Sequence, residues 1–158
     1  MSRLFVFTAG KEQARDHLYN SIANPISDGI IDQYLSEAEK DQFKAEDGNF
    51  YAWGARPGKR NNKTWDHMQT DDFVLCVYDS IYHYVTKCIK KYHNEELAEA
   101  IWGRDEKEGY IWEYMFFLTK PIKTFVPLNN LVKYLNKSYW GFSEIPDYRL
   151  DNISNDYT

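Results

Sequence analysis

The sequence contains no long hydrophobic run and is poor in cysteine. Of its 158 residues only Cys76 and Cys88 are cysteines, too few for a disulfide framework. No apolar run approaches the roughly 20 residues that cross a bilayer. After Arg3 only the short apolar run 4–7 follows, which is too brief for a secretory signal. We therefore expect a cytoplasmic protein with no membrane partner.

Metal-ligand and catalytic spacings are also missing. The histidines, His17, His67, His83 and His93, form no HxxxH or HxH pair, and the cysteines form no CxxC, so no zinc site is expected. There is no G-x-S-x-G elbow, and residues 54–60 lack the spacing of a phosphate-binding P-loop. We expect no cofactor, no bound metal and no catalytic residue.

Acidic residues leave one enzymatic alternative open. Asp71, Asp72 and Glu106 lie in the densest acidic clusters beside predicted strands. A nuclease needs carboxylates that converge on a divalent metal. These three lie at predicted turns, where charged residues are common, so metal-dependent cleavage is the least favoured function.

The chain has no overall excess of positive charge. Its net charge is −5, but segment 51–93 carries +3 and the remainder −8. A protein that coats nucleic acid without specificity is basic throughout, whereas a basic patch on an acidic body allows positioned contact with phosphates. A solvated face is the alternative. The predicted phosphate-binding residues are Arg56, Lys59, Arg60, Lys63, Lys87, Lys90 and Lys91.

Aromatic residues are abundant: 13 Tyr, 9 Phe and 5 Trp make up 17% of the chain. Tyr and Trp grip flat ligands with a broad apolar face, and aromatic residues also favour strands. Composition alone leaves a ligand-binding surface and a strand-rich core equally open.

Hydrophobic patterns predict an α+β domain. Strands are predicted in 4–8, 50–53, 72–79, 81–90, 111–119 and 122–127, and helices in 11–22, 28–34, 36–43, 95–102 and 128–135. Residues 55–71 show no periodicity and are predicted to be a long loop. This order favours a small curved β-barrel flanked by helices. We assign residues 1–143 to the domain and 144–158 to an acidic polar tail or linker.

Two tryptophans, each followed by glycine, form the most informative pattern. Trp53-Gly54 ends a predicted strand, and Trp102-Gly103 ends a predicted helix. An exposed indole stacks on a nucleic-acid base with about 1–3 kcal/mol, and two facing indoles can hold an extruded base. Glycine lets the backbone approach the edge of that base. Trp65 and Trp112 fit a core position better.

The order of the motifs resembles a known family. Trp53-Gly54 precedes the strand pair 74–84, which is followed by the segment AIWG at 100–103 and the run GYIWEYMFFL at 109–118. Together these motifs, over residues 4 to about 142, resemble the EVE/YTH-like branch of the PUA superfamily. They are particularly similar to the N-terminal recognition domains of McrB-type modification-dependent restriction systems.

The resemblance implies a non-catalytic reader of methylated DNA that flips the modified base into an aromatic cage. The implied cage residues are Trp53, Gly54, Trp65, Tyr78 and Trp102, and the implied base-edge contacts are Asn61, Asn62 and Asp79. Effector domains, such as a nucleotide-hydrolysing motor or a nuclease, would supply any cleavage. An RNA-binding PUA-like module remains the alternative.

Overall fold

The computed structural model describes residues 3–9, 12–79, 81–127 and 142–145. In chain order its elements are β1 (Leu4–Thr8), α1 (Glu12–Ser21), α2 (Asp28–Tyr34), α3 (Glu37–Phe43), β2 (Tyr51–Ala55), α4 (Lys59–His67), β3 (Phe73–Tyr78), β4 (Ile81–His93), α5 (Glu95–Trp102), β5 (Tyr114–Leu118), β6 (Ile122–Pro127) and β7 (Phe142–Ile145). None of the helices in these ranges has the length and apolar character that a bilayer crossing requires.

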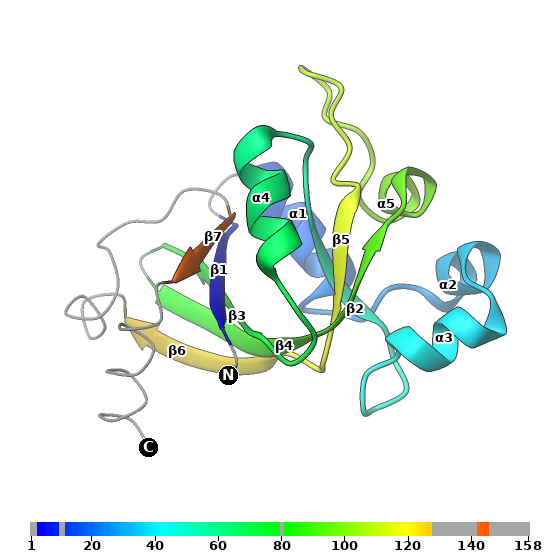
Figure 1. The fold of residues 1–158 in the computed structure, drawn as a ribbon, viewed down its shortest axis with the longest axis horizontal. Helices are drawn as coiled ribbons and strands as arrows, with labels where there is room; N and C mark the ends of the chain where they lie inside the picture. The colour runs from blue at the N-terminus through cyan, green and yellow to red at the C-terminus, as the bar shows by residue number, and fades with distance from the viewer. Residues whose placement is uncertain (1–2, 10–11, 80, 128–141, 146–158) are drawn as a thin grey trace.

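The strands in the described ranges form one mixed, curved sheet with the order β2-β5-β4-β3-β1-β7, and β6 pairs with β4 beside this path (Figure 1). β4 has thirteen residues; its first part pairs with β3 and β6, and its last part with β5. No pairing within the described ranges joins β2 to β7. The predicted α+β class is therefore confirmed, with a sheet that is curved but not closed into a barrel.

Both faces of β2 and β5 are buried. Tyr51 and Trp53 belong to a core cluster with Phe5 and Phe7 of β1, which α1 also joins. The alternate residue Ala52 belongs to a second cluster that contains residues of α2, α3 and α5. Because successive side chains of a strand point to opposite faces, one aromatic-rich strand supplies both clusters.

Helix termini follow the signals in the sequence. Ser36 and Glu39 form the predicted capping box at the start of α3, and the Asn94 side chain accepts a hydrogen bond from the Leu97 N–H at the start of α5. Gly103 follows α5 with a φ of 79°, in the left-handed region that favours glycine.

The prediction of a long loop over residues 55–71 was wrong, because Lys59–His67 forms α4. This helix has no buried residue, so it carries no apolar periodicity. Its main anchor is half-buried Trp65, whose Nε1 donates to the Met115 carbonyl over 2.9 Å. A helix with one half-buried apolar side chain, and otherwise held by polar contacts, leaves little signal in a hydrophobic pattern.

The C-terminal segment differs from the prediction at one point. Glu144 and Ile145, assigned to the tail, belong to β7, which pairs antiparallel with β1. The predicted helix 128–135 and residues 146–158 lie outside the described residues.

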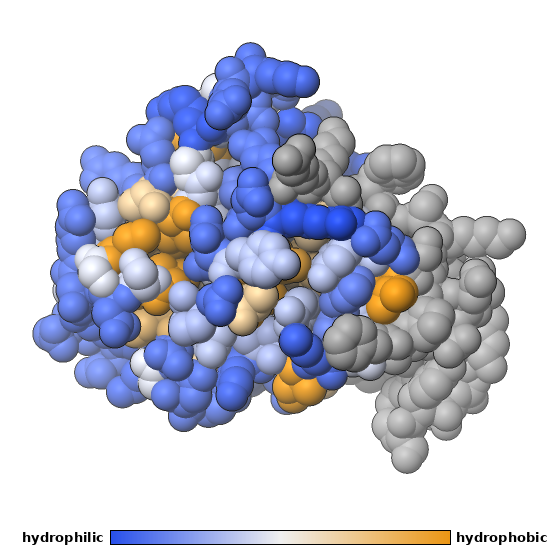
Figure 2. All heavy atoms as spheres, turned by 180° about the vertical axis from the view of Figure 1, so that it is seen from behind, coloured by the Kyte–Doolittle hydropathy of each residue, from blue (hydrophilic) through white to orange (hydrophobic). Residues whose placement is uncertain are grey.

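Figure 2 views the molecule from the side opposite to Figure 1. Hydrophilic residues dominate this face, a hydrophobic patch lies on the side of α2 and α5, and smaller hydrophobic spots lie elsewhere on it.

Candidate nucleic-acid interface

Three indoles converge where β2, the end of α5 and the segment before β5 meet. The ring centroid of Trp53 lies 6.3 Å from that of Trp102 and 5.0 Å from that of Trp112, and Trp102 and Trp112 are 6.2 Å apart. We call Trp53, Trp102 and Trp112 the indole cluster. Elements far apart in the sequence thus bring together the two tryptophans that the motifs predicted and a third that they assigned to the core.

The indole cluster is closed in this structure. We expected exposed indoles at Trp53 and Trp102, but only 3% and 7% of their surfaces are exposed, whereas Trp112 is half-buried. The ring planes cross at 48–64°. Because carbon atoms pack about 3.5–4 Å apart, a base between two rings needs parallel planes roughly 7 Å apart. A base therefore enters only if at least one indole moves.

Gly54 lets the backbone close around the cluster. A Cβ at this position would lie 2.3 Å from the Trp112 carbonyl oxygen and 2.9 Å from the Trp102 ring. No side chain fits there without displacing the segment that carries Trp112. The glycine after Trp53 thus permits a close approach of protein backbone.

Helix α1 holds the indole of Trp102 from the other side. Trp102 Nε1 donates a hydrogen bond to Ser21 Oγ over 3.0 Å, and Ser21 Oγ donates to the His17 carbonyl over 3.2 Å. The His17 ring meets the Trp112 ring edge-on, with the centroids 4.1 Å apart. Burial lowers the pKa of His17 to about 4, so the ring is neutral at pH 7.

An ion pair ties the connection between β2 and α4 to the segment that carries Trp112. Arg56 Nη1 donates to Glu108 over 3.1 Å, and the Arg56 guanidinium lies 5.3 Å from the centre of the Tyr110 ring. Two contacts therefore hold the connection 103–113, which joins α5 to β5. Trp112 packs against Gly54, and Glu108 forms an ion pair with Arg56.

Trp65 does not join the indole cluster. Its ring packs edge-on against Tyr114 at 5.3 Å and lies under the Lys91 ammonium at 4.7 Å. Its role in the structure is to dock α4 on the sheet.

Tyr78 lies in a different place, on a separate cavity of about 300 Å³ between α1 and the strands β3, β4 and β6. The Tyr78 ring stacks on His83, with centroids 3.6 Å apart, and Arg15 lies over it at 4.7 Å. Asp79 binds Arg15 Nη2 at 2.5 Å. The cavity is lined by Arg15, Leu18, Tyr19, Ala23, Tyr78, His83, Tyr84 and Lys123.

The predicted basic residues form more than one group. Arg56 and three exposed residues of α4, Lys59, Arg60 and Lys63, follow one another along the surface that begins at the end of β2. Arg60 donates to the Ser143 hydroxyl over 3.2 Å, while Lys59 and Lys63 make no ion pair with the described residues. We call these four residues the α4 cations.

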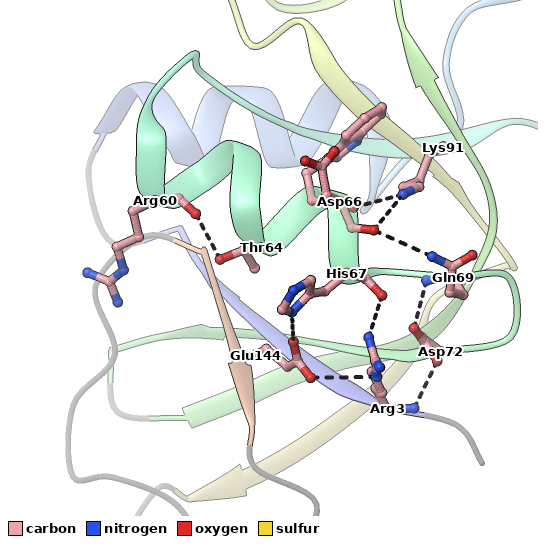
Figure 3. Close-up of polar contacts among 10 residues, drawn as sticks. Arg3, Arg60, Thr64, Asp66, His67, Gln69, Asp72, Lys91 and Glu144 are labelled. Carbon is pink, nitrogen blue, oxygen red and sulfur yellow. Dashed lines mark hydrogen bonds and ion pairs between the residues drawn. The ribbon is translucent and has the colours of Figure 1, made fainter.

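Polar contacts fix the C-terminal end of α4 (Figure 3). Lys91 Nζ donates to the carbonyls of Trp65 and Asp66 at 3.0 and 3.1 Å, where the helix dipole favours a cation. Arg3 donates to the carbonyl of His67, whose ring contacts the Glu144 carboxylate at 3.0 Å. The Lys91 ammonium therefore stabilises the C-terminal end of the helix that carries the α4 cations.

The remaining lysines lie elsewhere along β4. Lys87 lies over the Phe73 ring at 5.0 Å, and Lys90 donates to Gln42 of α3 over 2.8 Å. Asn61 and Asn62 cap the turn before α4: Asn61 donates to the Arg56 carbonyl, and the Asn62 side chain accepts from the Gly58 N–H.

No family model and no curated protein matches the sequence. Solved structures do match. The N-terminal domain of Thermococcus gammatolerans McrB bound to m5C DNA superimposes with a TM-score of 0.72 at 14% identity, covering 99% of this chain and 100% of that chain. The YTH domain of Zygosaccharomyces rouxii MRB1, in complex with N6-methyladenosine RNA, gives 0.56 at 15% identity over 98% and 85%. Human THYN1 with 5-methylcytosine DNA gives 0.54 at 10% over 99% of both chains.

This chain has the fold of the McrB N-terminal and YTH domains. The fold predicted from the order of the motifs is confirmed. Within this YTH-like fold, Trp53, Gly54 and Trp102 meet at one place, whereas Trp65, Tyr78, Asn61, Asn62 and Asp79 lie outside the indole cluster.

The sequence did not predict the position of three residues that lie in or beside the indole cluster. Trp112 was assigned to the core, His17 was considered only as a metal ligand, and Ser21 was not considered. The spacing of His17 and Ser21, four residues apart on one helix face, is the signal that links them.

The nuclease alternative finds no support in the described ranges. No group of three or more His, Cys, Asp and Glu side chains there is placed to hold a metal ion. Asp72 accepts hydrogen bonds from the backbone N–H groups of Arg3 and Gln69, at 2.8 and 2.7 Å, which gives it a structural role.

Proposed function

We propose that this chain is a non-catalytic domain that recognises a methylated base in double-stranded DNA by flipping it into the indole cluster. The convergence of Trp53, Trp102 and Trp112 around Gly54 carries this proposal. Each indole offers a stacking surface worth about 1–3 kcal/mol per base. A base inside the duplex cannot reach these rings, so it must leave the stack at a cost of a few kcal/mol.

Entry of the base requires Trp112 to move. Trp112 is the least buried of the three indoles and lies on the connection 103–113 rather than in a strand or helix. Trp53 is fixed by its strand, and Trp102 by its hydrogen bond to Ser21. We propose that residues 103–113 shift outward, and that the base then lies between the Trp112 ring and the fixed rings of Trp102 and Trp53.

The α4 cations would position the duplex. They start at Arg56, two residues after Gly54, and continue along an exposed helix. Contacts to phosphates fix the register of a duplex and carry no sequence information. Lys87 and Lys90 lie outside this surface. Lys91 stabilises α4 by donating a hydrogen bond to the Trp65 carbonyl.

Two observations bear on the choice between DNA and RNA. The matching domain with the TM-score of 0.72 is described as bound to m5C DNA and is covered from end to end, which favours DNA. The YTH domain with N6-methyladenosine RNA supports an RNA-binding module as the second candidate. In the DNA case, we propose that the domain supplies specificity to a restriction system whose effector domains hydrolyse nucleotides or cut.

The test is a binding series with matched duplexes that carry one cytosine, 5-methylcytosine, adenine or N6-methyladenine, and the same sequences as RNA. Trp112→Ala should weaken binding to the preferred methylated duplex by roughly 5- to 150-fold, the equivalent of one lost stacking surface. Tyr19→Ala removes an aromatic ring that is 63% exposed and lies outside both the indole cluster and α4, so it is the control and is expected to bind like the wild type.

Two outcomes would contradict the proposal. If Tyr78→Leu abolishes the preference for methylated DNA and Trp112→Ala does not, the base binds in the separate cavity beside Tyr78. Cleavage of any of these duplexes by the purified chain with Mg²⁺ would instead support a nuclease.

A further inference from the structure

One buried polar atom beside the indole cluster has no partner. Only 3% of His17 is exposed, and its Nδ1 makes no hydrogen bond in the described part of the chain. The ring lies edge-on to Trp112 at 4.1 Å and 6.0 Å from Trp102. A buried polar atom without a partner costs about 1–3 kcal/mol, so its presence needs an explanation.

The protonation state of His17 decides what this atom can bind. The backbone of Trp102 favours the protonated ring, but burial has the larger effect on the pKa of His17 and lowers it. We place the hydrogen of the neutral ring on Nε2, which leaves the lone pair on the unpartnered Nδ1. Burial keeps the ring neutral, with its pKa near 4, so Nδ1 is an acceptor with a free lone pair.

We infer that His17 Nδ1 accepts a hydrogen bond from the exocyclic amino group of the flipped base, and that the site therefore selects amino-bearing bases over oxo-bearing bases. This inference rests on the proposed binding of a base in the indole cluster. It predicts that the domain separates 5-methylcytosine from thymine, although both bases carry a methyl group at carbon 5.

The discrimination follows from donor and acceptor chemistry. Cytosine presents an N–H donor from its 4-amino group, and thymine presents a carbonyl acceptor at the same place. A lone pair on Nδ1 facing that carbonyl leaves both acceptors unsatisfied in a dry site. The methyl group contributes equally for both bases, so the methyl-binding surface cannot make this distinction.

The test uses duplexes in which the target nucleotide lies opposite an abasic site, so that the cost of breaking its base pair is the same for every base. Dissociation constants are measured for 5-methylcytosine, cytosine, thymine and uracil with the wild-type chain and with His17→Phe. The wild type should bind 5-methylcytosine about tenfold more tightly than thymine, the value of one hydrogen bond and one avoided unpaired acceptor. In His17→Phe this ratio should fall to about one, while the ratios of 5-methylcytosine to cytosine and of thymine to uracil persist.

A second measurement needs no variant. A duplex carrying 5-methylpyrimidin-2-one, which lacks the amino group but keeps the methyl group and the ring nitrogen acceptor, should bind the wild type about tenfold more weakly than 5-methylcytosine. Equal binding of these two duplexes, or an unchanged ratio of 5-methylcytosine to thymine in His17→Phe, would overturn the inference. Equal binding of 5-methylcytosine and cytosine by the wild type would instead overturn the proposed function.

Discussion

The indole of Trp102 and the hydroxyl of Ser21 form a buried hydrogen bond of 3.0 Å between the end of α5 and the end of α1. Ser21 is fully buried and donates in turn to the carbonyl of His17, one helical turn earlier. Trp102 thus has a fixed orientation before any ligand arrives. A pre-oriented ring loses little freedom on binding, which favours affinity.

Ser21→Ala should lower the free energy of unfolding by about 1–3 kcal/mol, because the Trp102 N–H is left buried without an acceptor. Urea denaturation measures this change. The double variant Ser21→Ala/Trp102→Phe removes both partners and should lose clearly less than the sum of the two single variants. Strict additivity would mean that the hydrogen bond does not stabilise the fold.

Gly54→Ala should disrupt the site, because the new Cβ would lie 2.3 Å from the Trp112 carbonyl. We expect a loss of about 1–3 kcal/mol in stability, as for an overpacked core, together with a reduced preference for the methylated duplex. Gly29→Ala is the matched control, since a Cβ there meets nothing within 4 Å. A Gly54→Ala chain as stable as the control would show that residues 103–113 shift freely.

The double variant Lys59→Gln/Lys63→Gln should weaken binding to methylated and unmethylated duplexes alike. Each lost phosphate contact should reduce the slope of log K against log salt by about 0.9. Lys87→Gln/Lys90→Gln has the same charge change away from the α4 cations and should leave the slope unchanged. A larger effect of this second pair would move the phosphate-binding surface to β4.

Glu108→Gln should tighten binding to any duplex, because it frees the Arg56 guanidinium from its ion pair and removes one negative charge beside the site. The expected gain is small, because the two side chains are more than half exposed and such pairs contribute about 0–1 kcal/mol. Fluorescence anisotropy at low salt resolves it best. Glu37→Gln, a matched change on exposed α3, should have no effect on binding.

Stability should fall as the pH drops from 7 to 5. The pKa of His17 is about 4 in the folded chain and near 6.5 when unfolded, so the unfolded state binds more protons between these values. The stabilisation is complete above about pH 6.5 and is lost progressively toward pH 4. Between pH 7 and 5 the wild type should lose about 2 kcal/mol.

His17→Phe is the control for the pH effect, because it has no group that titrates at this position. Two acidic residues, Asp16 and Asp105, partly oppose the fall in the pKa of His17. Glu39, Asp47 and Asp105 have pKa values lowered chiefly by backbone N–H groups, so their stabilisation is complete above the carboxyl pKa of the unfolded chain and is lost at more acid pH than that of His17. If urea midpoints of both proteins change equally between pH 7 and 5, another group causes the effect.

Local signals in the sequence predicted most helices and strands. The Ser36–Glu39 capping box, the Asn94 cap and the apolar runs of β1 and β3 each act over a few residues, so they are visible without the fold. Helix α4 was missed because Trp65 and Lys91, which hold it, belong to distant parts of the chain.

The residues of the candidate site could be grouped from the sequence only in part, for the same reason. Trp53-Gly54 and Trp102 carry a local motif, whereas the place of Trp112 depends on how residues 103–113 pack against Gly54. Tyr78 lies in a strand and is aromatic, which made it a plausible cage wall. Its contact with Arg15 depends on where α1 crosses the sheet, and no local pattern contains that information.

The pairing of β1 has a consequence for the order of folding. This first strand pairs in parallel with β3, where Leu4 lies opposite Phe73, and antiparallel with β7, where Leu4 lies opposite Ile145. During synthesis β1 therefore has no ladder partner until β3 has been made, whose first residue, Phe73, comes 69 positions after its partner Leu4. Contacts of such long sequence separation slow folding, because the chain must close a large loop first. The hairpin of β3 and β4 has a local turn, so it should form first and provide the edge on which the N-terminal strand docks.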